Sequence, residues 1–110
     1  MKKFNFENKV EPIEIAGKSY TLDSGNVDFL KKAFSMKEKF ETQLSAIDTD
    51  NLTPEGIDEL VEVMKGVINT FLGEKEFEYI FNHEDCNKSI NYITKVCVFL
   101  TDEIKIQSGK

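Results

Sequence analysis

The sequence has 110 residues, of which 40% are hydrophobic and 31% are charged, with a formal net charge of −6. This length and composition are typical of one soluble globular domain and exclude a disordered chain, which is poorer in apolar residues. Every basic residue is a lysine, and no apolar run approaches the ~20 residues of a membrane helix. Because phosphate and anionic lipid binding need clustered lysine or arginine, we expect no nucleic acid and no membrane among the partners.

Residues 1–25 show the alternating apolar pattern of β-strands. Gly17 lies where a tight turn needs a positive φ, and Pro12, which lacks an amide donor, is expected at the start or edge of a strand. The pattern predicts a β-hairpin in which residues 10–15 pair with residues 19–22. The apolar residues that define this pattern are Phe4, Phe6, Ile13, Ile15, Tyr20 and Leu22.

The predicted hairpin needs a packing partner, because two isolated strands are only marginally stable in water. It must pack on the rest of the chain or gain strands from another copy, since unpaired strand edges associate readily. We therefore expect self-association, and four apolar residues are the candidate protein-interaction residues: Phe4, Phe6, Ile13 and Ile15.

After the turn and cap residues 23–26 the apolar period changes to that of a helix. The first helix is predicted over 26–47, with a core-facing stripe that includes Val27, Phe34 and Phe40. Thr53 as N-cap and Pro54 at the first helical position begin the second helix, which ends before Gly73. A short third helix is predicted over 74–81.

The last predicted helix covers residues 88–104, and a frayed tail follows at 107–110. Tyr92 and Phe99 lie off the apolar face of this helix and are expected to contact something else. The expected fold is thus α+β and mainly α, one domain over 1–110. Its parts are an extended segment and hairpin at 1–25 and a bundle of three longer helices and one short helix at 26–106.

Residues with chemical potential are few and poorly spaced for catalysis. His83 and Cys86 have metal-ligand side chains, but a structural zinc site needs four ligands, and no group orients His83 for nucleophilic catalysis. Asp48 and Asp50 begin like a calcium loop, but Thr53 replaces its obligatory glycine. We expect no enzyme activity, no cofactor and no metal.

The two cysteines, Cys86 and Cys97, are expected to be free thiols. The basic start of the chain, Met1 to Lys3, is not followed by the apolar stretch of a secretory signal. Both observations favour a reducing cytoplasm.

Three segments together resemble a known family: IEIAGKSYTL at 13–22, FLGE at 71–74 and FEYIF at 77–81, followed by a polar break and a final amphipathic helix. In this arrangement the chain resembles the tail assembly chaperones, small proteins from the tail modules of long-tailed bacteriophages and prophages of low-GC Gram-positive hosts. The resemblance covers nearly the full chain, but it contains no short motif that assigns binding residues.

The resemblance implies a non-enzymatic role in the host cytoplasm. Such chaperones keep the long hydrophobic tape measure protein soluble and help to recruit the major tail protein, and they are absent from the finished virion. Members commonly occur in a short and a frameshift-extended form. Two alternatives remain open: a small acidic regulatory protein that inhibits a host protein, or a structural tail or head-completion protein.

Overall fold

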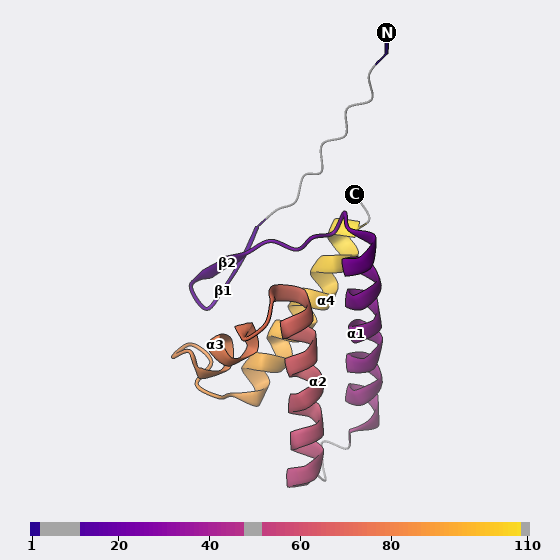
Figure 1. The fold of residues 1–110 in the computed structure, drawn as a ribbon. Coiled ribbons are helices and arrows are strands. Elements are labelled where there is room, and N and C mark those ends of the chain that lie inside the picture. Colours follow the sequence, from indigo (N-terminus) through magenta and orange to yellow (C-terminus); the bar gives the residue numbers. More distant parts are fainter. Residues whose placement is uncertain (3–11, 48–51, 109–110) are drawn as a thin grey trace.

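The computed structural model describes residues 1–2, 12–47 and 52–108 (Figure 1). In this part of the chain a two-stranded antiparallel hairpin precedes four helices, which confirms the expected α+β, mainly helical fold. The elements are β1 (Ile13–Ile15), β2 (Lys18–Tyr20), α1 (Val27–Ala46), α2 (Pro54–Leu72), α3 (Glu76–Asn82) and α4 (Ile90–Ser108).

The hairpin closes through a two-residue turn. Ile15 pairs with Lys18, which leaves Ala16 and Gly17 in the loop with φ angles of 53° and 77°. Two successive positive φ values define the type I′ turn, whose twist matches that of the flanking strands. Pro12 precedes β1, as expected, and residues 10 and 11 of the predicted first strand lie outside the described residues. Strand β2 begins one residue before the predicted start and ends two residues before the predicted end.

Helix α1 begins where the sequence predicts, because the side chain of Asn26 accepts a hydrogen bond from the Phe29 amide. Its expected core stripe is partly wrong: Phe34 is 39% exposed and Val27 is 64% exposed, whereas Ala33 and Phe40 are buried. Adjacent residues lie about 100° apart around a helix, so a core direction through Ala33 turns Phe34 outward.

Helix α2 has the predicted caps and lies antiparallel beside α1 (Figure 1). The Thr53 hydroxyl accepts a hydrogen bond from the Gly56 amide, and Gly73 ends the helix with a φ of 127°. The two helices approach closely at Gly66, where a Cβ atom would lie 2.7 Å from Cε of Met36. A glycine therefore makes room for the methionine side chain.

Helix α3 is shorter than predicted and begins at Glu76, after Lys75 in the left-handed conformation. Helix α4 extends to Ser108, and Gln107 is buried although the sequence placed it in the tail. The core combines side chains from the hairpin segment and all four of these helices: Ile13, Tyr20, Leu22, Ala33, Phe40, Met64, Ile68, Ile80, Ile93, Leu100 and Ile104.

Candidate functional site

The predicted interaction residues fall into two groups. Ile13 and Ile15 are buried within the chain itself, at 8% and 6% exposure, so in one copy they belong to the core. Phe4 and Phe6 lie outside the described residues. A contact between copies through these four residues therefore stays a prediction.

The residues with metal or nucleophile chemistry do not converge. Within residues 1–2, 12–47 and 52–108, no group of three or more His, Cys, Asp or Glu side chains is placed to hold a metal ion. The His83 ring nitrogen Nδ1 accepts a hydrogen bond from the Asp85 amide, which closes a local turn. Both cysteines are free and buried, and burial raises the pKa of Cys97 to about 12 and that of Cys86 in the same direction.

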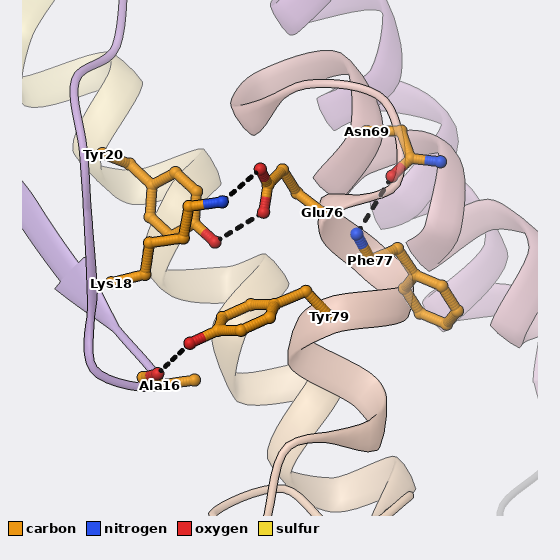
Figure 2. Close-up of polar contacts among 7 residues, drawn as sticks. All are labelled: Ala16, Lys18, Tyr20, Asn69, Glu76, Phe77 and Tyr79. Atoms are coloured by element: carbon orange, nitrogen blue, oxygen red, sulfur yellow. Dashed lines mark hydrogen bonds and ion pairs between the residues drawn. The ribbon is translucent and has the colours of Figure 1, made fainter.

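A polar network ties the hairpin to α3 (Figure 2). Glu76 Oε1 lies 2.7 Å from Lys18 Nζ, and Glu76 Oε2 accepts a 2.9 Å hydrogen bond from the Tyr20 hydroxyl. Tyr79 donates its hydroxyl to the Ala16 carbonyl at 3.0 Å. We call Lys18, Tyr20, Glu76 and Tyr79 the hairpin clamp.

The contacts of the hairpin clamp determine the protonation states of Glu76 and Tyr20. The Lys18 hydrogen bond is the main cause that lowers the pKa of Glu76, so the carboxylate stays charged. Burial, with a smaller contribution from Glu76, raises the pKa of Tyr20 well above its usual value, so the phenol stays a donor. The Lys18 ammonium also lies 5.2 Å from the centre of the Tyr79 ring, a cation–π distance. The clamp thus fixes the hairpin on α3 at neutral pH.

The clamped hairpin forms one wall of a groove of about 290 Å³, and α4 forms the other. The groove residues are largely apolar, with one opposite charge on each wall: Glu14, Ile15, Ala16, Tyr92, Lys95, Val96 and Phe99. Phe99 is 43% exposed. We call this site the hairpin–α4 groove. A larger depression of about 440 Å³ lies between α1 and α2, but apart from Val63 it is lined by polar and charged side chains.

Part of this site is predictable from the sequence. Tyr92 and Phe99, which lie off the apolar face of the last helix, both line the groove. Lys95 and the hairpin wall are not predictable, because nothing in a local pattern shows that residues 14–16 pack beside residues 92–99. The hairpin clamp was missed for the same reason.

Comparisons with protein-family models, with curated proteins and with solved structures found no match to this chain. Among the described residues, no helix combines the length and the apolar character needed to cross a membrane.

Proposed function

We propose that this protein is a non-enzymatic assembly factor that binds another protein through the hairpin–α4 groove. The observation that carries the proposal is the exposed ring of Phe99 beside the apolar residues Ile15 and Val96. Large exposed aromatic side chains at a concave apolar site are typical anchors of protein interfaces.

The physical contribution of such an anchor is substantial. Complete burial of an exposed phenylalanine side chain is worth about 1.5–3 kcal/mol, and covering the 43% of Phe99 that is still exposed is worth about 1 kcal/mol of this. Glu14 and Lys95, at the rim of the groove, supply polar contacts that orient the partner rather than most of the affinity. The rigid hairpin clamp keeps the groove preformed, which lowers the entropy cost of binding.

The specific role that we propose is that of a tail assembly chaperone in the bacterial host cytoplasm. This step rests on the sequence resemblance of residues 13–22, 71–74 and 77–81. The partner is then the tape measure protein, whose apolar surface the groove would cover, and the major tail protein is the second partner. The negative net charge of −6 would help to keep such a complex soluble.

Co-expression with the tape measure protein of the same gene cluster tests this function. We expect the wild-type chain to bring that partner into the soluble fraction and to co-purify with it. Phe99→Ser should lose most of the co-purified partner, while Phe34→Ser, a matched control at 39% exposure on α1, should retain it.

Two results would count against the proposal at different levels. A partner that stays insoluble with the wild-type chain and with any frameshift-extended form removes the chaperone role. Equal recovery with Phe99→Ser and Phe34→Ser keeps the role but removes the hairpin–α4 groove as its site.

A further inference from the structure

The outer face of α4 carries an apolar seam that continues beyond the groove. Tyr92, Phe99 and Ile106 follow one another at intervals of seven residues, so they lie on one face of the helix. Phe99 and Ile106 are 43% and 56% exposed, and Tyr92 is half-buried against the core. The seam spans about 21 Å along the helix at ~1.5 Å per residue.

Two exposed charges of opposite sign flank the centre of this seam on the same side. Lys95 lies one turn before Phe99, and Asp102 lies nearly one turn after it. No ion pair of either residue occurs among the described residues. The charges therefore remain available to a partner.

The arrangement is self-complementary when the helix is reversed. If two copies of α4 meet antiparallel with Phe99 at the centre, Tyr92 of each copy faces Ile106 of the other, because both lie seven residues from the centre. Lys95 then faces Asp102 on both sides of the two-fold axis. A parallel two-fold arrangement would instead place the Lys95 and Asp102 side chains of the two copies on opposite flanks of the seam, where neither charge faces an opposite one.

We propose that a second copy of this chain docks on the outer face of α4, antiparallel, with Phe99 at the centre of a two-fold interface. Each copy contributes the same surface, as a two-fold interface requires. The pairing of Lys95 with Asp102 sets the orientation, and the three apolar residues supply the area that is removed from water.

The edge of the hairpin is a poorer site for a second copy. Pro12 precedes β1 without an amide donor, and β1 carries the exposed charge of Glu14 at its middle. The Ala16 carbonyl already accepts the Tyr79 hydroxyl. Proline and charged residues at a strand edge are features that prevent strand addition.

This interface goes beyond the proposed function and does not depend on it. Because Phe99 lies both in the seam and in the hairpin–α4 groove, the second copy and a partner protein would compete for the same side chain. In the absence of a partner, the dimer interface would then cover the aromatic side chain of Phe99 until the partner binds.

Sedimentation equilibrium of the purified chain without any partner tests the interface. We expect the wild type to approach about twice its monomer mass of 12.6 kDa at high micromolar concentration. Phe99→Ser should be monomeric, and Phe34→Ser should dimerise like the wild type. Circular dichroism of each variant verifies folding, since both side chains are more than one third exposed.

Charge exchange tests the antiparallel orientation. K95D places two carboxylates opposite each other and should raise the dimer dissociation constant about ten-fold or more at low salt. The double variant K95D/D102K restores opposite charges and should recover the wild-type constant. A wild type that stays monomeric overturns the proposal, and so does a dimer that K95D leaves unchanged or that the double variant does not restore.

Discussion

At Glu76 a single carboxylate holds two side chains of β2. One oxygen contacts the Lys18 ammonium and the other accepts the Tyr20 hydroxyl, as Figure 2 shows. A hydrogen bond to a charged group contributes more than one between neutral groups, whereas the ion pair to the half-exposed Lys18 is screened by water. Lys18 therefore does more to keep the carboxylate charged, whereas the part-buried Tyr20 hydrogen bond contributes more to the stability of the fold.

Replacing Glu76 by glutamine should destabilise the fold by about 1 kcal/mol at neutral pH, because the charged acceptor is lost. The wild-type carboxyl has a pKa lowered by folding, so its stabilisation is present above its unfolded pKa and is lost as the pH falls through the folded one. Urea unfolding at pH 7 and near pH 3 should show the difference between wild type and E76Q shrinking at acid pH.

Tyr20→Phe provides the control for that experiment, since it removes the hydroxyl and leaves the carboxylate with Lys18. It should be destabilised at neutral pH as well. If E76Q and the wild type differ by the same amount at both pH values, the contribution of Glu76 is not electrostatic.

No pattern in the sequence indicates these contacts. Lys18 and Tyr20 are 58 and 56 residues away from Glu76, and nothing in the sequence distinguishes Glu76 from the neighbouring glutamates at 74 and 78. Pairings at such separations depend on the tertiary arrangement, which local periodicity does not contain. The hairpin clamp could therefore be recognised only in the folded molecule.

Among the elements, α3 depends most on a neighbour. It has seven residues, and its N-cap residue, Lys75, makes no side-chain capping hydrogen bond. The amide of Phe77 instead donates to Oδ1 of Asn69, a residue of α2, at 3.0 Å. One helix thus supplies the cap of another, and α3 in turn carries Glu76 and Tyr79 of the hairpin clamp.

Asn69→Ala should destabilise the protein by about 1 kcal/mol, the usual cost of losing a capping acceptor. Asn69→Asp retains the acceptor and should remain close to the wild type. Thermal or urea unfolding of the three proteins checks this. Equal stability of the alanine and aspartate variants would mean that the Asn69 hydrogen bond does not stabilise α3.

Element boundaries were predictable where local chemistry sets them. Thr53 and Pro54 begin α2 and Gly73 ends it, as their residue types indicate. The face of α1 was not predictable to the same degree, since Phe34 is exposed while the smaller Ala33 is buried. Which of two adjacent apolar residues faces the core depends on how closely the neighbouring helix approaches.

At the scale of the whole molecule, burial is concentrated at one end of the α1–α2 pair. Between Phe40 and Leu60 no described residue is buried, and Ile57 lies at the surface. In Figure 1 these ends of α1 and α2 extend away from the hairpin, α3 and the rest of the bundle. This end of the molecule has a low density of apolar contacts.

Native-state hydrogen exchange should detect this difference. We expect amides at 43–46 and 57–59 to exchange through local opening, much faster than those at 64–68, because local stability follows apolar burial. Uniform protection along α2 would contradict the expectation and would indicate that the pair opens as one unit.

The fold class was predictable from the spacing of apolar residues, which alternate around the hairpin and change to helical spacing from Val27 onward. The groove was not predictable from this spacing, because its two walls, Glu14 to Ala16 and Tyr92 to Phe99, come from opposite ends of the chain. Periodicity identifies which residues are apolar, but only the assembled bundle shows which of them remain uncovered.

The close approach of α1 and α2 at Gly66 affects which substitutions the protein can accept at positions 36 and 66. Any side chain at position 66 takes up the space that the end of Met36 now fills, so the two positions share one volume. If alanine replaces Gly66, the side chain at position 36 must move or be shorter. With glycine at position 66, methionine at position 36 fits unchanged. Because Cε is the flexible end of the Met36 side chain, a rotation suffices for alanine at 66, and a coupled change at position 36 is expected only with larger side chains at 66.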